Sequence, residues 1–395
     1  MIDVAVIGGG QAGLTMSHAL SKRGIGHVVL ERHRIAERWR SERWDSLRFQ
    51  FPNWALRLPD FSYSGDKPDE YAHRDDVVRF IEAYAASIEA PVRTGVTVRR
   101  LGRTDEGFEL ACDDGVLTAR NVVIATGPYQ QTVVPDMADG LGAVFQLTAS
   151  DYRNPEQLPD GGVLVVGAGA SGCQVAEELL DAGRQVYLSV GTHRRAPRRY
   201  RGRDFIWWIN ALGWDDRIAD PGAARQPPLV ISGAKGGRTV DLREYAAAGM
   251  VLAGRFSGAR SGVASFAPDL AESLAAGDAS YAAFIAAADA YLNVMAGEGP
   301  PPTTYPEPTG VESLDLNAAN IRTVIWATGY RYDFGWVDLD VFASGELEHT
   351  RGVTAVPGAY FLGLPLLYKT KSSFLSGVGE DAAFLAEQID VRRNS

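Results

Sequence analysis

The chain has 395 residues, 46% of them hydrophobic and 22% charged, and its 39 basic and 49 acidic residues give a formal net charge of −10 at pH 7. This composition is typical of a globular protein with two or three domains, and the negative charge argues against a nucleic-acid-binding protein. Its two cysteines, Cys112 and Cys173, exclude a disulfide framework, a C-x-x-C pair and a zinc site, and they fit a reducing, cytoplasmic compartment.

The first stretch of the chain predicts a βαβ unit. Residues 2–7 are apolar and β-branched, as in a buried parallel strand, and they begin too early to leave room for a signal peptide. No run of about 18 apolar residues suggests a membrane span. A helix is expected over residues 11–23, with Gly24 as its stop, and a second strand over 27–30 runs into Glu31.

A glycine-rich turn, G-x-G-x-x-G, joins this strand to this helix. Its glycines are Gly8, Gly10 and Gly13. The first permits a tight turn, the second lets the backbone approach a pyrophosphate, and the third allows close packing of helix on strand. An acid such as Glu31 accepts hydrogen bonds from the hydroxyls of an adenosine ribose. We therefore interpret the unit as a dinucleotide site; the alternative is a glycine-rich turn without ligand.

The next part of the chain mixes a loop, a helix and several strands. Residues 32–54 are rich in Arg and Trp and lack periodicity, which predicts a long ordered loop of the kind that is usually functional. Residues 73–88 predict an amphipathic helix, and residues 92–120 predict a small antiparallel meander with an Asp-Gly turn. Residues 121–128 predict a buried strand that contains Ala125-Thr126-Gly127 at its end.

A second βαβ unit follows a connection over residues 129–162, which is rich in Pro, Gly and Asp. Residues 163–166 predict its first strand, residues 173–182 its helix and residues 185–190 its second strand. The glycine-rich turn is repeated as Gly167, Gly169 and Gly172. Two copies of the unit imply two nucleotides, or one dinucleotide site and one vestige.

Arginines, and no acid, follow the last strand of the second unit, in the stretch 189–203. A phosphate on the adenosine ribose would be repelled by Glu and attracted by Arg. The pattern therefore favours NADP over NAD, with Arg194 or Arg195 as the residue that binds the phosphate. The alternatives are a solvated basic stretch and a patch for an acidic partner.

The remainder of the chain is less regular, and residues 204–320 carry no motif that indicates a substrate. Residues 205–209 are strongly apolar, and their two tryptophans are expected in the core or at a substrate entrance. Residues 280–295 predict an alanine-rich helix, and residues 299–308 predict a proline-rich loop.

A strand over residues 321–328 runs into a second Ala-Thr-Gly. The last part of the chain then reads as strand, loop, glycine turn and helix. A helix that begins near Val378-Gly379 would present free amides to an anionic or oxygen-rich ligand.

These motifs resemble those of the class B flavoprotein monooxygenases, in particular the flavin-containing monooxygenases and their bacterial relatives. The two glycine-rich turns, the first Ala-Thr-Gly and W-A-T-G-Y at residues 326–330 carry the resemblance. It implies an α/β fold with two Rossmann-like dinucleotide-binding domains, the first of them discontinuous. We expect an FAD-binding domain over residues 1–155 and 325–395, and an NADP-binding domain over residues 156–324 with a substrate-side insertion.

The resemblance implies FAD on the first unit and NADPH on the second. The expected FAD contacts are Gly8, Gly10, Gln11, Ala12, Gly13, Glu31, Arg32, Trp39, Arg40 and Val96. The expected NADPH contacts are Gly167, Gly169, Ala170, Ser171, Gly172, Ser189, Arg194 and Arg195. Further cofactor contacts are expected at the strand ends and the last glycine turn, at Thr126, Gly127, Thr328, Gly329, Ser373 and Gly379.

One family fingerprint, F-x-G-x-x-x-H-x-x-x-(Y/F), departs from the expected pattern. When its last aromatic residue is placed on Tyr152, its Phe falls on Gly142, its Gly on Val144 and its His on Thr148. This departure keeps open an alternative function, an NADPH-dependent flavoprotein reductase or oxidase that inserts no oxygen.

As the family implies, NADPH reduces the flavin, a C4a-hydroperoxyflavin forms with O2, and one oxygen passes to the substrate. We therefore expect an FAD- and NADPH-dependent monooxygenase acting on a small organic molecule, by N- or S-oxygenation or by Baeyer–Villiger insertion. Relatives place an amide close to the flavin where Gln50 or Asn53 lies, and these are the candidate catalytic side chains. The alternative for Asn53 is a turn-forming residue after Pro52.

Two other classes of protein share parts of this pattern. A flavin disulfide reductase of the thioredoxin-reductase type would need a redox cysteine pair, which the sequence lacks. A nucleotide-binding sensor would keep FAD as a structural ligand. The partners expected for a monooxygenase are a small-molecule substrate and O2, without nucleic acid or membrane, and a homodimer is left open.

Overall fold

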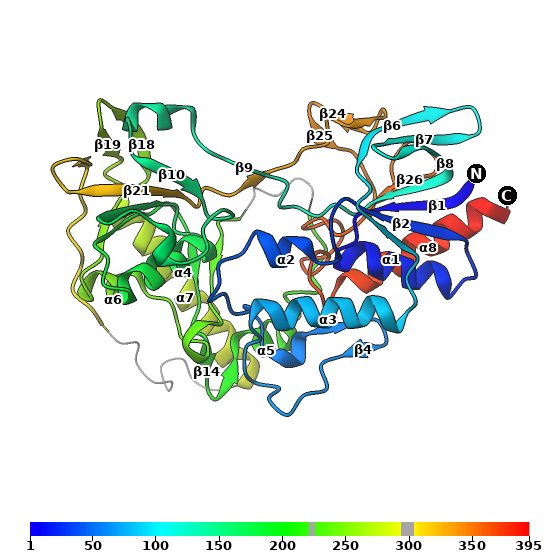
Figure 1. Ribbon diagram of the computed structural model, residues 1–395. Coiled ribbons are helices and arrows are strands. Elements are labelled where there is room, and N and C mark those ends of the chain that lie inside the picture. Colours follow the sequence, from blue (N-terminus) through cyan, green and yellow to red (C-terminus); the bar gives the residue numbers. More distant parts are fainter. Residues whose placement is uncertain (221–225, 294–303, 395) are drawn as a thin grey trace.

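The computed structural model describes residues 1–220, 226–293 and 304–394. Two units, each built around a sheet, lie side by side, the first at the right of Figure 1 and the second at the left. Both chain ends lie at the outer edge of the first unit, because β1 (Ile2–Ile7) and α8 (Val378–Asn394) both belong to it. The predicted α/β fold with two Rossmann-like units is confirmed.

The two ends of the chain build the first sheet. In spatial order its strands are β23 (Val337–Asp338), β6 (Val98–Thr104), β7 (Gly107–Cys112), β8 (Gly115–Ile124), β1, β2 (His27–Glu31) and β5 (Val92–Thr94), and β26 (Ala359–Phe361) also pairs with β8. The first helix, α1 (Gln11–Ser21), crosses from β1 to the parallel β2, and α8 packs along it. The C-terminal segment therefore belongs to the first sheet and its helix layer.

The predicted meander differs from the observed strands in two ways. β5 is parallel to β2, and the antiparallel strands are β6, β7 and the first half of β8. The second half of β8 is parallel to β1, so β8 joins the end of the predicted meander to the strand predicted at 121–128. Its first half is partly exposed and its second half buried, which explains why the pattern suggested two strands.

The second sheet is parallel throughout. In spatial order its strands are β10 (Phe145–Thr148), β21 (Ile321–Trp326), β11 (Gly162–Val166), β12 (Val186–Ser189) and β17 (Val251–Ala253). Its crossover helix after β11 is α4 (Ala170–Asp181). Strand pairing places residues 145–148 and 325–326 in this sheet, whereas the sequence prediction assigned them to the first domain. The cause is β10, a strand of four residues whose pairing partner, β21, lies far along the chain.

The remaining helices and a set of short strands lie in the segments that connect and extend the two sheets. The helical segments are α2 (Glu37–Ser41), η1 (Asn53–Ala55), α3 (Arg74–Ser87), η2 (Asp136–Leu141), η3 (Pro155–Gln157), α5 (Phe205–Ala211), η4 (Ala234–Gly236), α6 (Leu242–Ala247) and α7 (Leu270–Leu292). The short strands are β3 (Arg57–Leu58), β4 (Phe61–Ser62), β9 (Gln131–Thr132), β13 (Arg194–Arg195), β14 (Arg199–Tyr200), β15 (Arg203–Asp204), β16 (Leu229–Val230), β18 (Phe256–Arg260), β19 (Val263–Phe266), β20 (Ser313–Asp315), β22 (Tyr330–Arg331), β24 (Phe342–Ala343) and β25 (Glu346–Leu347).

The predicted helices agree with these bounds in different degrees. α3 fills the helix predicted at 73–88, and His73 caps it. α7 begins at Leu270, earlier than the helix predicted at 280–295. The prediction missed its first turns because their many small Ala, Gly and Ser residues give no clear apolar periodicity. Residues 294–295 of that prediction, and 299–303 of the predicted loop, lie outside the described residues. No helix in the described parts of the chain has the length and apolar character needed to cross a membrane.

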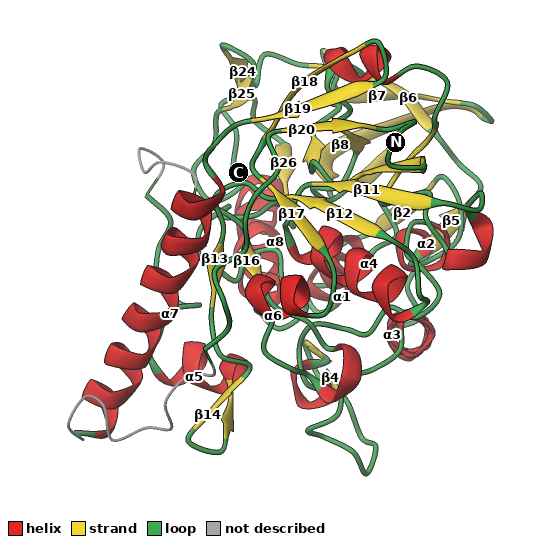
Figure 2. Cartoon of the chain, turned by 90° about the vertical axis from the view of Figure 1, so that its left-hand side faces the viewer, coloured by secondary structure: helices red, strands yellow, loops and turns green. Residues whose placement is uncertain are grey.

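The insertion of the second unit shares a small hydrophobic core with residues 51–55. The long helix α7 lies at one side of Figure 2, with α5 and β14 at its lower end. Trp208 is 1% exposed, and its indole Nε1 donates to the carbonyl of Tyr200 at 3.0 Å, so it belongs to this core. Trp207 is half-buried and lines a shallow surface pocket together with Trp54.

Two of the described segments that connect the two units are paired with each other. β9 and β22 form an antiparallel ribbon with Thr132 opposite Tyr330 and Gln131 opposite Arg331. In Figure 1 this ribbon region connects the two sheets. The Arg331 Nε also donates to the side-chain oxygen of Gln131 at 2.9 Å.

Candidate functional site

The first glycine turn is packed against the end of β8. Gly8 has a φ of +115°, and a Cβ added there would lie 2.5 Å from the carbonyl oxygen of Ala125. A Cβ at Gly13 would lie 1.8 Å from the carbonyl oxygen of Gly8, so α1 touches the turn directly. Gly10 differs, since an added Cβ would meet nothing within 4 Å, and no side chain of the described residues caps α1 there. Open space and free amides are what a pyrophosphate requires.

The second glycine turn repeats this geometry. Gly167 has a φ of +107°, and a Cβ added there would lie 2.5 Å from the carbonyl oxygen of Ala327. A Cβ at Gly172 would lie 1.8 Å from the carbonyl oxygen of Gly167, while one at Gly169 would have Pro228 as its nearest neighbour at 3.9 Å. Each Ala-Thr-Gly motif therefore supplies the carbonyl on which the first glycine of a turn packs, which gives this repeated motif a structural reason.

Glu31 lies at the end of β2, directly beside the first turn. Its Oε2 accepts from the amide of Gly9 at 2.7 Å, and its Oε1 accepts from the amide of His33 at 2.9 Å. The amide of Val96 donates to the Glu31 carbonyl at 3.0 Å, which places both predicted residues together. Arg32, in contrast, is exposed.

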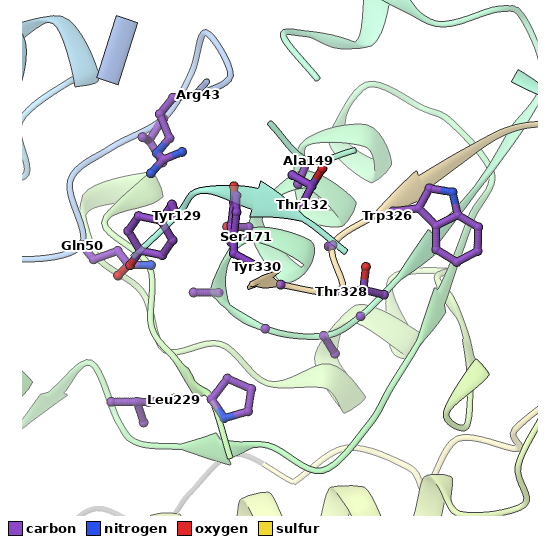
Figure 3. A pocket seen from close by; sticks show the side chains of 18 of the residues that line it. Arg43, Gln50, Tyr129, Thr132, Ala149, Ser171, Leu229, Trp326, Thr328 and Tyr330 are labelled. Carbon is purple, nitrogen blue, oxygen red and sulfur yellow. The ribbon is translucent and has the colours of Figure 1, made fainter. Parts of the chain in front are cut away.

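A cavity of about 880 Å³ lies between the two units (Figure 3). One wall is the second glycine turn with the end of β21, and the facing wall is the loop 43–51. Of the predicted NADPH and strand-end contacts, the lining includes Gly167, Gly169, Ala170, Ser171, Ser189, Thr328 and Gly329. Of the predicted flavin-side residues, it includes Gln11, Trp39 and Ser373. Residues of both units therefore share one cavity.

Gln11 and Ser373 close the end of the cavity that belongs to the first unit. The Gln11 Nε2 donates to the Ser373 carbonyl at 2.6 Å, which ties the N-terminus of α1 to the C-terminal segment. Gly379, at the start of α8, packs against Pro59, since a Cβ there would lie 2.7 Å from the proline ring. Ala12 packs against Gly363 in the same region.

Other predicted contacts are held by neighbouring protein groups. Thr126 accepts from the Gln130 Nε2 at 3.0 Å, and the Gly127 carbonyl accepts from the same nitrogen at 2.8 Å. Arg40 forms an ion pair with Glu82, so the predicted Trp39-Arg40 pair separates into one cavity residue and one surface ion pair.

The two candidate amides have different surroundings. Gln50 lines the cavity, and Figure 3 shows its side chain near Tyr129. Asn53 is not among the lining residues of the described chain; it begins η1, and its Nδ2 donates to the Lys67 carbonyl at 2.9 Å. Gln50 therefore lies where its amide could meet a bound molecule, whereas the Asn53 amide is bonded within the protein, and the catalytic role of either residue stays a prediction.

Arg198 holds the loop that carries Gln50. It is 2% exposed, and its Nη1 donates to the Gln50 carbonyl at 2.7 Å. Its Nε and Nη2 donate to the two oxygens of Asp204, both at 3.0 Å, and its guanidinium carbon lies 4.5 Å from the centre of the Tyr71 ring. Asp204 also accepts from the Ile206 amide at 2.8 Å and so caps α5. One buried guanidinium thus joins the second unit to the wall formed by the loop 43–51.

The arginines predicted to bind the ribose phosphate point at protein groups. Arg195 pairs with Asp241 at 2.8 Å and with Asp278 at 2.6 Å, and Arg194 donates to the Pro227 carbonyl at 2.9 Å. The arginine that does line the cavity near Ser189 is Arg255. Sequence reasoning missed Arg255 because it lies after β17, far along the chain from the second glycine turn.

Tyrosines near the strand ends were also missed as cavity residues. Tyr330, the last residue of W-A-T-G-Y, lines the cavity; its hydroxyl lies 2.6 Å from that of Ser150, and its ring makes an edge contact with Tyr129. Tyr152, the surviving position of the fingerprint, is fully buried, and its hydroxyl donates to Glu178 at 2.9 Å.

Comparison with known proteins decides the family. Residues 5–211, more than half of the chain, match the family model described as pyridine nucleotide-disulphide oxidoreductase. The chain belongs to this family of oxidoreductases.

Related proteins place this oxidoreductase more closely. A CzcO-like oxidoreductase of Geobacillus kaustophilus is 32% identical over 98% of each chain. The indole-3-pyruvate monooxygenase YUCCA1 of Oryza sativa subsp. japonica is 34% identical over 47% of each chain. Among solved structures, a flavin-containing monooxygenase from Stenotrophomonas maltophilia has a TM-score of 0.68 at 20% identity over 99% of both chains, and it therefore has the same fold.

The disulphide chemistry in the family name has no matching cysteine pair in this oxidoreductase. Cys112 ends β7 in the first sheet, and Cys173 lies in α4 beside the second sheet. Cys173 is fully buried, and burial raises the pKa of its thiol. Because the two cysteines belong to different units, they cannot act together as a dithiol.

A buried histidine close to the cavity gives the oxidoreductase a pH-dependent stability. His193 is 3% exposed, next to the cavity residue Thr192, and burial lowers its pKa below the usual 6.5. Burial lowers the pKa of His27 and His349 in the same way. The unfolded chain then binds more protons than the folded one, so this contribution is complete above about pH 6.5 and declines as the pH falls.

We expect the urea midpoint of unfolding to fall between about pH 7 and pH 5.5, above the range in which most carboxylates titrate. His193→Gln should reduce that decline. A midpoint that stays constant over this range in the wild type would contradict the expectation.

Proposed function

We propose that the chain is an FAD- and NADPH-dependent monooxygenase that inserts one oxygen atom of O2 into a small organic substrate. The observation that carries the proposal is the cavity between the two units, in which the second glycine turn forms one wall and Gln11, directly after Gly10 of the first glycine turn, forms part of the lining. The monooxygenase names of the rice relative and of the Stenotrophomonas protein support oxygen insertion for this arrangement.

The residues of the first unit fit FAD. The space above Gly10 is open, the first amides of α1 carry no side-chain cap, and α1 has no acid in its first turn. Glu31 lies beside the turn, where an acid can bind ribose hydroxyls. Gln11 and Ser373 would then lie where the cofactor reaches the cavity, since they line its first-unit end.

The residues of the second unit fit NADPH in the same way. Gly169 leaves space for a pyrophosphate, and α4 also begins without a side-chain cap or an acid in its first turn. Arg255 would bind the ribose phosphate, with Arg194 behind Gln226 as a second positive charge. Arg195 is less suited, because two carboxylates lie at 2.8 and 2.6 Å from its guanidinium, whereas Arg255 has one carboxylate, that of Asp269, at 3.6 Å.

Arg255→Gln should therefore raise the KM for NADPH by about tenfold or more while leaving the KM for NADH nearly unchanged. Arg195→Gln is the matched control, and it should alter stability without altering the ratio of the two KM values. Steady-state kinetics with both nucleotides measure this ratio. An equal effect of Arg255→Gln on both nucleotides would show that Arg255 does not bind the phosphate.

When bound, the two cofactors supply hydride transfer and the activation of O2. The chain itself binds them in one cavity, excludes water and orients the substrate. Trp39, Trp44, Phe49 and Phe51 give the flavin-side wall a largely aromatic surface, which limits water at the reacting atoms. The Gln50 side chain is the polar amide of this wall and would donate a hydrogen bond to the oxygen that is transferred.

The test is a balance of products against NADPH. The purified flavoprotein is given NADPH, 18O2 and one amine, sulfide or ketone at a time, and labelled product and H2O2 are counted. We expect labelled product in an amount approaching the NADPH consumed for one substrate class, which also separates heteroatom oxygenation from Baeyer–Villiger insertion. Stoichiometric H2O2 with every class would instead identify a reductase or oxidase.

A further inference from the structure

The charged side chains that line the cavity are basic, and of these Arg255 has a carboxylate beside it, that of Asp269 at 3.6 Å, which does not line the cavity. Among the described residues that line it, the charged side chains are Arg43, Arg48 and Arg255, and none is acidic. This contrasts with the chain as a whole, whose net charge is −10. Walls of low dielectric constant focus the field of such charges, so the cavity attracts anions.

The three arginines lie in two places. Arg255 lies beside Ser189, whose hydroxyl accepts from the next amide, Phe256, at 2.9 Å, and the proposed NADPH site uses it. Arg43 and Arg48 lie on the facing wall, in the loop that also carries Gln50. The proposed function leaves these two charges without a role.

Arg43 is held in position by aromatic rings and not by an acid. Its guanidinium carbon lies 5.8 Å from the centre of the Trp39 ring and 5.4 Å from that of Tyr129, and its Nη1 donates to the Glu42 carbonyl at 2.7 Å. Figure 3 shows the side chain directed toward Tyr129 and the cavity. A guanidinium stacked in this way keeps hydrogen-bond donors free for a ligand.

Neighbouring arginines show that acids are available in this region. Within the described residues, neither Arg43 nor Arg48 has a carboxylate oxygen within 4.0 Å. The surrounding arginines that do have a carboxylate partner are Arg38 with Glu42, Arg40 with Glu82 and Arg74 with Asp45. Within the loop 43–51, both arginines therefore line the cavity and neither has a carboxylate partner in the described chain.

We propose that Arg43 and Arg48 form an oxyanion site in the cavity. The ligand class is an organic anion, with a carboxylate or phosphate for the guanidinium groups and a flat apolar part for the aromatic wall. The oxyanion can come from an acidic substrate or from a phosphate of the dinucleotide. This inference rests on the proposed function, since it assumes that the same cavity receives nicotinamide and substrate.

The experiment measures binding without turnover. Phenylacetate, its neutral counterpart phenylacetamide, and NADP+ are titrated into the oxidised flavoprotein, with intrinsic tryptophan fluorescence and calorimetry as readouts. The variant is Arg43→Gln, and the matched control is Arg57→Gln, an exposed arginine that does not line the cavity. Thermal unfolding of both variants verifies the fold.

Wild type should bind phenylacetate more tightly than phenylacetamide, and Arg43→Gln should weaken phenylacetate binding by roughly tenfold or more. If NADP+ binding is unchanged in that variant, the oxyanion belongs to the substrate; if NADP+ binding weakens and phenylacetate shows no preference, it belongs to the cofactor. The site is overturned if neither affinity differs from that of Arg57→Gln by more than about twofold. Because no oxygen transfer is measured, failure of the monooxygenase proposal would be seen separately, in the product balance.

Discussion

Gly169→Ala should give a folded, flavin-containing protein whose affinity for NADPH is lower by about tenfold or more. The nearest atom to an added Cβ at Gly169 is 3.9 Å away, and its φ of −74° suits any residue. The added methyl group should therefore change the stability of the fold little. It fills the space in which a pyrophosphate would approach the backbone at Gly169. Calorimetric titration with NADP+ and the visible flavin spectrum measure the two properties separately.

The equivalent change in the first turn should have the complementary result. Gly10→Ala should fold and be purified without flavin, because an added Cβ meets no protein atom within 4 Å and so occupies ligand space alone. Gly13→Ala and Gly172→Ala serve as contrasts; each Cβ would lie 1.8 Å from a backbone carbonyl, so both should unfold or misfold. A Gly10→Ala protein with full flavin content would show that the first turn does not bind it.

Arg198→Met should lower the free energy of unfolding by about 3–5 kcal/mol, the range found when one member of a buried ion pair is removed. Asp204, with 10% of its side chain exposed, would lose its charge partner, and the Gln50 carbonyl would lose its donor. Urea unfolding followed by tryptophan fluorescence gives the value.

Arg199→Met, one residue further along and exposed, is the matched control and should change stability by less than about 0.5 kcal/mol. Hydrogen exchange should also rise in the loop 47–51 of Arg198→Met and stay unchanged in β1. If both variants had the same stability, Arg198 would not hold the two units together.

Sequence reasoning succeeded where local pattern and chemistry coincide. Both glycine turns could be predicted because each needs small residues at fixed spacing, and the structure shows why at Gly13 and Gly172, where any side chain would meet a carbonyl oxygen. The discontinuous first domain was implied by family resemblance, and the pairing of β26 with β8 confirms it.

Contacts between residues that lie far apart in the sequence could not be predicted from local sequence patterns. The local sequence indicated no acidic partner for Arg195, but the fold brings it to Asp241 and Asp278, which lie far along the chain. Arg255 carries no motif and reaches the cavity because β17 pairs with β12. Such pairings depend on the order of strands in a sheet, and no local spacing encodes that order.

The paired crossing of β9 and β22 has a mechanical consequence. Because the two linkers are adjacent and hydrogen-bonded, a swivel of one unit against the other would use this ribbon as its hinge, and it would also have to break contacts such as that of Arg198 with the Gln50 carbonyl. Thr132 and Tyr330 belong to the ribbon and also line the cavity. Any such swivel would therefore reshape the walls around a bound molecule, and occupancy of the cavity would in turn restrain the hinge.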